Sequence, residues 1–202
     1  MQQKPKKIND IAELKKIVKN KYNPWKVKEK NSKYLNHWAT ICTYLFENKK
    51  TYTILQQPNS VHIVAITDKN EIVLQIRRFR PGVFNKPTLE LVAGYIDNDD
   101  PEQTAIRELQ EEIGANITNI QSMSSAIYKP DAVSSSAYGF VARIKDFSAQ
   151  NIDKEEQEEF DIILMDIKTF VQNIIILQES MSAPDALFAI QAYYQWIIPG
   201  KI

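Results

Sequence analysis

The segment Ala105–Ala115, with the sequence AIRELQEEIGA, limits the possible folds more than any other part of this chain. A helix advances by about 100° per residue, so Glu108, Glu111 and Glu112 fall on one face and a row of apolar residues falls on the opposite face. Like charges at positions i and i+4 destabilise a helix, so this acidic face calls for an explanation. A solvated surface is the common explanation. A bound divalent cation is the other, because Mg²⁺ and Ca²⁺ prefer carboxylate oxygens.

Both ends of this helix carry residues that favour helix termini. Asp99 or Asp100 can cap its N-terminus, Pro101 suits the first turn, and Gly114 suits the position after the last turn. The strand-like run Thr88–Ala93 comes shortly before it. We therefore expect the acidic residues to lie beside the turn that joins a strand to this helix.

The composition narrows the class of protein. A chain of 202 residues with 44% hydrophobic content can bury a core in one domain, or in one domain with an appendage. Its 25 basic and 25 acidic residues cancel, which argues against a surface for nucleic acid or for a membrane. The single cysteine, Cys42, excludes an internal disulfide framework. Because no long apolar run and no signal-peptide pattern occurs, we expect a cytoplasmic protein without membrane or nucleic-acid partners.

The first 57 residues are predicted to form an N-terminal unit. Asn9 or Asp10 can cap a short amphipathic helix that runs to Val18. Strand-like runs follow at Trp25–Lys28, His37–Glu47 and Thr51–Gln56. Such a small sheet cannot bury much apolar surface alone, so we expect it to pack on the rest of the chain or on a second copy.

Residues 58–202 are predicted to form the second domain, after a boundary at Pro58, Asn59 and Ser60. Strands are expected at Val61–Thr67, Glu71–Arg78, Thr88–Ala93, 117–127, 137–145 and Phe160–Asp166, and helices at Lys168–Gln178 and Ala183–Ile197. Strands mixed with a few helices indicate an α+β fold or an α-β-α sandwich.

The acidic helix resembles part of a known motif. Arg107–Ala115 matches the second half of the Nudix box, whose pattern is Gly, five residues, Glu, seven residues, then Arg-Glu-aliphatic-x-Glu-Glu-x-Gly-aliphatic. The first half departs from this pattern, since Gly94 lies one residue too close to Arg107. Asp99 or Asp100 also takes the place of the early Glu.

Two further runs resemble the ADP-ribose and ADP-sugar pyrophosphatase branch of the Nudix hydrolases. They are Ile72–Pro81, IVLQIRRFRP, and Thr88–Asp97, TLELVAGYID. The resemblance extends from about Trp25 to the C-terminal helix. It implies a Nudix α-β-α sandwich with a mixed sheet, and a small N-terminal antiparallel sheet domain through which members of this branch form homodimers.

The resemblance also implies a metal site. Glu108, Glu111 and Glu112 match the carboxylates that hold the metal in this family, and Ala93 matches a residue whose backbone carbonyl is a further ligand. Oxygen ligands alone select Mg²⁺ or Mn²⁺ over zinc. The resemblance also implies that Glu112 is catalytic.

Substrate-binding positions are implied in the same way. Arg80 matches an arginine that contacts the phosphates or the ribose of the substrate, and Glu90 belongs to the element that precedes the box. Trp25 and Trp38 resemble two tryptophans that sandwich adenine in some eukaryotic members. Base stacking suits any nucleotide, while the alternative interpretation is that both tryptophans are interface or core aromatics.

The catalytic base of this branch is a glutamate on a loop late in the fold. The acidic run 153–159 occupies the corresponding place. Glu159 is the first candidate, followed by Glu158 and Glu156. His37 and His62 lie in predicted strands with no suitably spaced ligand partner, so both are interpreted as structural.

The predicted function is Mg²⁺-dependent hydrolysis of the pyrophosphate of a nucleoside diphosphate sugar, with ADP-ribose as the favoured substrate and AMP and ribose 5-phosphate as products. One alternative substrate is GDP-mannose or another nucleoside diphosphate derivative. An alternative of another class is a catalytically weakened Nudix domain that binds a nucleotide or a protein. The shortened first half of the box and the atypical loop Lys129–Ser136 favour that alternative.

Overall fold

The structure is a computed structural model that describes residues 10–20, 25–83, 86–97, 100–128, 130–147, 159–177 and 180–202. The strands are β1 (Val27–Asn36), β2 (Ala39–Phe46), β3 (Thr51–Gln56), β4 (Ser60–Thr67), β5 (Glu71–Arg77), β6 (Thr88–Glu90), β7 (Val92–Tyr95), β8 (Ala115–Ile127), β9 (Val133–Ser134), β10 (Ser136–Phe147) and β11 (Phe160–Asp166). The helices are α1 (Ile11–Asn20), α2 (Pro101–Ile113), α4 (Ile167–Asn173) and α5 (Ala183–Ala192), with short helical turns η1 (Pro81–Val83), η2 (Ile174–Leu177) and η3 (Tyr193–Ile197).

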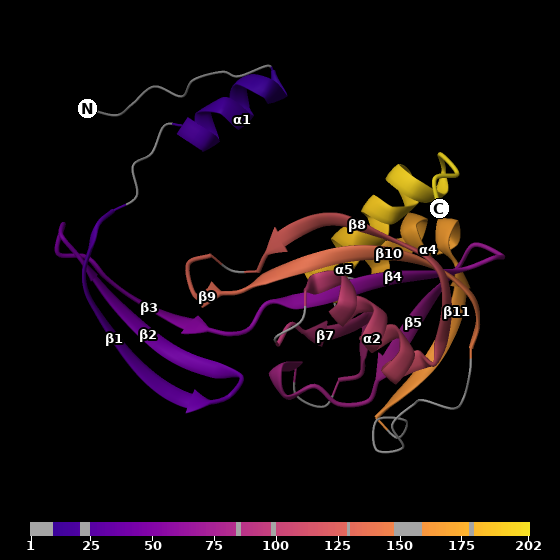
Figure 1. Ribbon diagram of the computed structural model, residues 1–202, viewed down its shortest axis with the longest axis horizontal. Helices are drawn as coiled ribbons and strands as arrows, with labels where there is room; N and C mark the ends of the chain where they lie inside the picture. The colour runs from indigo at the N-terminus through magenta and orange to yellow at the C-terminus, as the bar shows by residue number, and fades with distance from the viewer. Residues whose placement is uncertain are drawn as a thin grey trace.

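Within the described residues the strands form two sheets (Figure 1). The larger sheet has the order β11-β5-β4-β10-β8, with β6 paired to β5 and β7 paired to β4. Its pairs are antiparallel except for β4 and β10, which run parallel, so the sheet is mixed. The smaller sheet has the order β1-β2-β3-β9.

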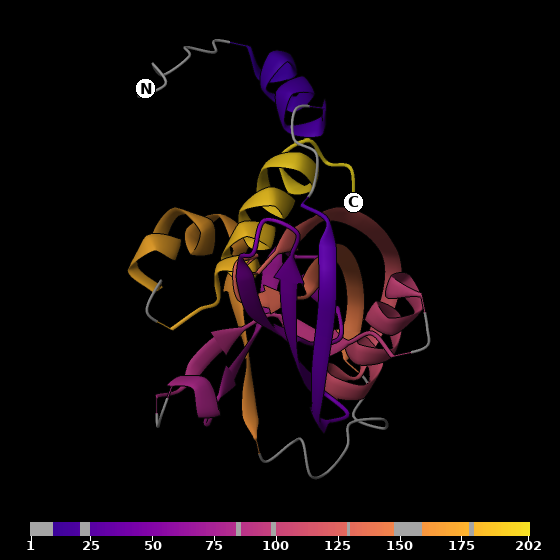
Figure 2. The same ribbon diagram turned by 90° about the vertical axis from the view of Figure 1, so that its left-hand side faces the viewer.

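The larger sheet is the centre of an α-β-α sandwich, with α2 on one face and α4 and α5 on the other (Figure 2). Every residue of β4 before its last is buried, and successive side chains point to opposite faces. Val61 and Ile63 share a buried cluster with Leu109 of α2. The alternate residue Val64 shares the opposite cluster with Phe170 of α4. The predicted α+β sandwich is confirmed.

Helix α2 has the ends that its sequence predicts. The Asp100 carboxylate accepts hydrogen bonds from the backbone N–H groups of Glu102 and Gln103, at 2.8 and 3.0 Å, so Asp100 is the N-cap. Pro101 opens the first turn, and Gly114 ends the helix in the left-handed conformation with φ of 60°. The other candidate cap lies outside the described residues.

The first hairpin differs from the prediction. His37 and Trp38, expected within a strand, form the turn between β1 and β2, and β1 is much longer than the short strand expected at Trp25–Lys28. The Asn36 side chain accepts a hydrogen bond from the backbone N–H of Trp38 at 2.9 Å, which is a local turn that competes with strand pairing.

Two later boundaries also differ. The run Thr88–Ala93 is broken at the buried residue Leu91, because β6 pairs with β5 whereas β7 pairs with β4. The helix expected at Lys168–Gln178 begins at Ile167, where the Asp166 side chain caps it, and becomes a 3₁₀ turn in η2.

The smaller sheet, called the arm below, extends away from the sandwich (Figure 1). All residues of β1 are exposed, as expected for a sheet without a covering layer. Trp25 packs against Phe46 and Tyr52, with ring centroids 5.8 and 6.1 Å away. Strand β9 ties the arm to the sandwich by pairing in parallel with Leu55 and Gln56 of β3. Among the described residues, no helix combines the length and the apolar character needed to cross a membrane.

Candidate active site

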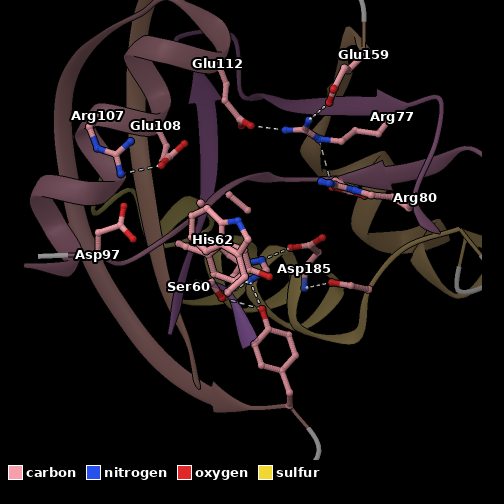
Figure 3. Close-up of a pocket in the computed structure, with 17 residues that line it drawn as sticks. Ser60, His62, Arg77, Arg80, Asp97, Arg107, Glu108, Glu112, Glu159 and Asp185 are labelled. Atoms are coloured by element: carbon pink, nitrogen blue, oxygen red, sulfur yellow. Dashed lines mark hydrogen bonds and ion pairs between the residues drawn. The ribbon is translucent and has the colours of Figure 1, made fainter. Parts of the chain in front are cut away.

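A pocket of about 540 Å³ opens between α2, β7, the end of β5 and the N-terminus of α5 (Figure 3). Its lining combines charged, aromatic and hydroxyl side chains from segments far apart in the sequence. These residues are Trp38, Ser60, His62, Arg77, Arg80, Glu90, Ala93, Gly94, Tyr95, Asp97, Arg107, Glu108, Glu112, Tyr128, Glu159, Ser182 and Asp185. Most of the predicted site residues are therefore found in one place.

The last glutamate of the box is held by two residues of β5. Arg77 donates a hydrogen bond to Oε1 of Glu112, and Gln75 donates to Oε2 at 2.9 Å. Only 8% of the Arg77 side chain and 4% of the Glu112 side chain are exposed, so the two opposite charges compensate one another in a buried setting.

Arg77 also lies close to two other carboxylates. Its Nε atom is 3.5 Å from Oε2 of Glu90, and its Nη1 atom is 3.5 Å from Oε2 of Glu159. Its guanidinium group lies over the ring of Phe160, 4.6 Å from the centroid. One buried cation thus gathers three carboxylates. The sequence indicated a role for Arg80 but none for Arg77, since the partners of Arg77 come from distant parts of the chain.

Arg80 and Glu90, both predicted to bind substrate, form an ion pair with each other at the pocket wall. Arg80 Nε donates to Glu90 Oε1 at 2.7 Å, and Nη2 donates to Oε2. Burial alone would raise the pKa of Glu90, but hydrogen bonds from Arg80 and from Thr88 outweigh it, so the pKa lies below the ordinary value. The hydrogen bond with Glu90 in turn raises the pKa of Arg80.

The other two box glutamates have different surroundings. The Glu108 carboxyl group lies in the pocket against Gly94, where an added Cβ atom would stand only 2.1 Å from Glu108 Cδ. Glu111 is 51% exposed and does not line the pocket. Arg107 bridges them, with Nη2 at 3.0 Å from Glu108 and Nη1 at 2.8 Å from Glu111.

The oxygen ligands suit a hard divalent cation, and Nudix hydrolases generally use such ions. The pocket is bordered by the possible oxygen ligands Ala93, Asp97, Glu108 and Glu112. Because Gly94 has no side chain, a carboxylate can lie next to its backbone. These are ligand types that Mg²⁺ and Mn²⁺ prefer. In the described ranges no three His, Cys, Asp or Glu side chains are close enough together to hold an ion as they stand.

The two tryptophans lie at opposite ends of the arm. Trp38, in the β1–β2 turn, reaches the pocket and stacks on Tyr95 with centroids 4.9 Å apart and planes inclined by 26°. Trp25 lies beside β2 near Phe46, and it does not line this pocket. Within one chain the two rings are therefore not positioned to enclose the same base.

Of the three candidates for the base, Glu159 lines the pocket, with 66% of its side chain exposed. Its backbone carbonyl accepts a hydrogen bond from the N–H of Arg78 at 3.0 Å, which fixes the start of β11 beside β5. Glu158 and Glu156 lie outside the described residues.

The pocket also contains residues that sequence reasoning did not select. His62 Nδ1 lies 2.6 Å from Oδ1 of Asp185, and His62 Nε2 lies 2.6 Å from Tyr128 Oη and 3.1 Å from Ser60 Oγ. His62, interpreted from the sequence as structural because no ligand partner is spaced nearby, thus has hydrogen-bonding partners that come from distant segments of the chain. Alternation along β4 places Ser60 and His62 on one face, but Asp185 comes from α5, 123 residues later.

Comparison with known proteins identifies the family. Residues 56–181 match the family model described as the NUDIX domain. An ADP-ribose pyrophosphatase of Bacillus subtilis is 25% identical over 142 residues, which are 70% of this chain and 74% of the relative. A GDP-mannose pyrophosphatase of Yersinia enterocolitica is 30% identical over 94 residues, which are 44% of this chain and 49% of the relative.

Two further matches extend these comparisons. A methanol dehydrogenase activator of Bacillus methanolicus is 28% identical over 122 residues, which are 60% of this chain and 65% of the relative. A crystal structure of an ADP compounds hydrolase has a TM-score of 0.71 at 18% identity, covers 89% of this chain and 98% of its own, and shows the same fold. Because the family model covers more than half of the sequence and agrees with the predicted Nudix pyrophosphatase, the chain belongs to the Nudix family.

Proposed function

We propose that this Nudix protein hydrolyses the pyrophosphate bond of a nucleoside diphosphate sugar, and that ADP-ribose, cleaved to AMP and ribose 5-phosphate, is its substrate. The observation that carries the proposal is one pocket in which Arg77 and Arg80 face the carboxylates of Glu90, Glu112 and Glu159. Guanidinium groups bind phosphate oxygens, whereas carboxylates bind the cations that accompany them. The pyrophosphatase names of two relatives support a nucleotide sugar.

The metal ligands in this proposal are Glu108, Glu112 and the carbonyl oxygen of Ala93, with Glu111 as an additional carboxylate from the rim. We expect Mg²⁺ or Mn²⁺, which would polarise the phosphoryl oxygens and lower the pKa of a bound water. Arg77 already balances the charge of Glu112, so a cation at this position would share that role with Arg77.

Glu159 is the proposed general base. Its carboxylate is 66% exposed and lines the pocket 3.5 Å from Arg77 Nη1, so it can reach a solvent water and accept its proton. Arg80 donates through Nε and Nη2 to the two oxygens of Glu90, which fixes the orientation of the guanidinium group. Its remaining N–H donors suit a phosphate group, and they would stabilise the negative charge that develops during hydrolysis.

The proposed assembly is a homodimer formed through the arm. Residues 1–57 contain thirteen lysines and four acidic residues, a net charge of +9, whereas residues 58–202 have a net charge of −9. The zero total therefore conceals two oppositely charged parts. Docking the basic arm of one copy on the acidic sandwich of another would be favoured by this complementarity, and it would also cover the exposed strand β1. The partner's Trp25 could then approach Trp38.

Purified protein should be assayed for release of AMP, GMP or free phosphosugar from ADP-ribose, GDP-mannose and related compounds, with Mg²⁺ or Mn²⁺. We expect Glu112→Gln to lower kcat at least about a hundredfold, because it removes a charged ligand and the partner of Arg77. Glu111→Gln is the matched control, with a smaller loss, since Glu111 is about half exposed and does not line the pocket.

Activity of Glu112→Gln within a few-fold of wild type would contradict the metal assignment. Preferential turnover of GDP-mannose would replace ADP-ribose as the substrate and leave the chemistry intact. Thermal stabilisation by nucleotides without turnover of any compound, with either metal, would instead support the weakened binding domain.

A further inference from the structure

Four hydrogen-bonded side chains form a second polar centre in the same pocket. Ser60, His62, Tyr128 and Asp185 come from β4, the end of β8 and α5, and we call them the hydroxyl corner. Ser60, His62 and Asp185 are each at least nine-tenths buried, and all four line the pocket. Figure 3 shows Ser60, His62 and Asp185 apart from Glu112 and Arg77, and the proposed mechanism assigns the four residues no role.

The direction of the hydrogen bonds follows from Asp185. This residue lies in the first turn of α5, which Ser182 caps. A carboxylate only accepts hydrogen bonds, so His62 Nδ1 carries the proton that joins it to Asp185 Oδ1. In the neutral imidazole, Nε2 is then an acceptor.

The two hydroxyl groups can satisfy this acceptor in two ways. Tyr128 Oη can donate to His62 Nε2 at 2.6 Å while Ser60 Oγ donates to Tyr128 Oη at 2.7 Å, or Ser60 Oγ can donate to His62 Nε2 at 3.1 Å while Tyr128 Oη donates to Ser60 Oγ. Burial and the nearby charge of Asp185 hold the pKa of Tyr128 above its ordinary value, although its hydrogen bond with Ser60 acts in the opposite direction, so the phenol keeps its proton. Both hydroxyl protons are used in hydrogen bonds inside the corner. The oxygen lone pairs of Ser60 and Tyr128 can therefore only accept hydrogen bonds from a ligand in the pocket.

We propose that the hydroxyl corner binds a sugar hydroxyl group of the ligand, with Ser60 and Tyr128 accepting its hydrogen bond and with His62 and Asp185 as positioning residues. The inference deepens the proposed function and rests on it, since a nucleoside diphosphate sugar supplies such hydroxyls. A corner of acceptors backed by a carboxylate repels phosphate, whereas Arg77 and Arg80 attract it. The two polar centres therefore orient the ligand, with its diphosphate at the arginines and a sugar at the corner.

The test measures binding of ADP-ribose and of its deoxy analogues by calorimetry, in EDTA and at about pH 8, above the ordinary titration range of histidine. The analogues lack one hydroxyl each, on the adenosine ribose or on the terminal ribose, so they show which sugar meets the corner. We expect one analogue to bind about tenfold more weakly than ADP-ribose, the effect of one lost hydrogen bond with a buried partner.

The variants decide whether the corner causes this preference. Ser60→Ala and Tyr128→Phe should each weaken the binding of ADP-ribose but not the binding of the sensitive analogue. The tenfold ratio of the two affinities should therefore fall toward one. His62→Phe should lower the same affinity ratio although both hydroxyl groups remain. If His62 were purely structural, its replacement would weaken the binding of both ligands equally. Tyr194→Phe, which removes an exposed hydroxyl outside the pocket, is the matched control and should keep the ratio.

The outcomes separate this inference from the proposed function. If the protein hydrolyses ADP-ribose with Mg²⁺ but binds every deoxy analogue as tightly as ADP-ribose, the inference alone is overturned. The same holds if the affinity ratio is unchanged in the variants. A preference that Tyr128→Phe abolishes, without hydrolysis by the wild type, supports the inference and overturns the hydrolase. No binding of ADP-ribose or any analogue, together with no hydrolysis of any tested nucleoside diphosphate sugar with either metal, overturns both.

Discussion

Replacing Arg77 by methionine should destabilise the protein strongly, because Arg77 is the buried cation between three carboxylates. Methionine keeps much of the side-chain length but removes the charge and the hydrogen bond to Glu112. Breaking a buried ion pair by removing one partner costs about 3–5 kcal/mol, since the other charge is left uncompensated. Glu159 is largely exposed and should add little to this loss.

The free energy of unfolding should be measured with urea for wild type, Arg77→Met and the neighbouring Arg78→Met. Arg78 pairs with Asp161 at 2.9 Å, but both side chains are well exposed, at 58% and 60%, so its removal should cost less than about 1 kcal/mol. The pair of variants compares a buried with a solvated arginine only one position apart on the same strand end.

Changes in pH and in Mg²⁺ concentration test whether the loss of stability arises from Glu112. Burial without a counter-charge favours the protonated form of Glu112, so the loss in Arg77→Met should be smaller at about pH 5 than at about pH 8. Added Mg²⁺ should recover more free energy in this variant than in wild type if the ion binds Glu112. Equal losses in Arg77→Met and Arg78→Met, independent of pH, would refute the reasoning.

Three further predictions follow from contacts in and near the pocket. Gly94→Ala should lower metal-dependent turnover by at least about tenfold with little change in secondary structure, because the new Cβ atom would displace the Glu108 carboxyl group; kinetics and circular dichroism test this. Glu90→Gln should cost stability near neutral pH. Because folding lowers the pKa of Glu90, its contribution is present above the ordinary glutamate pKa and is lost as the pH falls through the folded value, so the free energies of unfolding of wild type and variant, measured in urea, should converge as the pH is lowered below the ordinary glutamate pKa. Asp100→Ala should lower the free energy of unfolding by about 1 kcal/mol through loss of the α2 cap, whereas Asp146→Ala, on an exposed strand end, should change it less.

Local signals made α2 predictable. Its cap, its terminal glycine and the spacing of its glutamates all lie within fifteen residues, and the resemblance to the Nudix box extends the same information. The failures concern contacts that the sequence order does not display. Arg77 meets Glu112 across 35 residues and His62 meets Asp185 across 123, so neither pair has a spacing that can be read in one window.

The hairpin of the arm shows a different limit. Aromatic and β-branched residues indicated β2 correctly, but most of β1 was missed because its sequence is largely polar and charged. The turn at Trp38 was also missed, because it depends on a local hydrogen bond to the Asn36 side chain. Total charge likewise concealed the opposite charges of the two parts of the chain. A sum over the whole sequence discards the position of each lysine along the chain, and a separate count for residues 1–57 and 58–202 recovers it.

The junction between arm and sandwich links two properties that are usually measured separately. The arm contributes Trp38 to the pocket, and through β9 it is hydrogen-bonded to the chain segment that follows Tyr128. Any rotation of the arm on association with another molecule must therefore shift two walls of the pocket at once. Thermodynamic reciprocity then requires that a ligand filling the pocket alters the association constant by the same factor by which association alters ligand affinity.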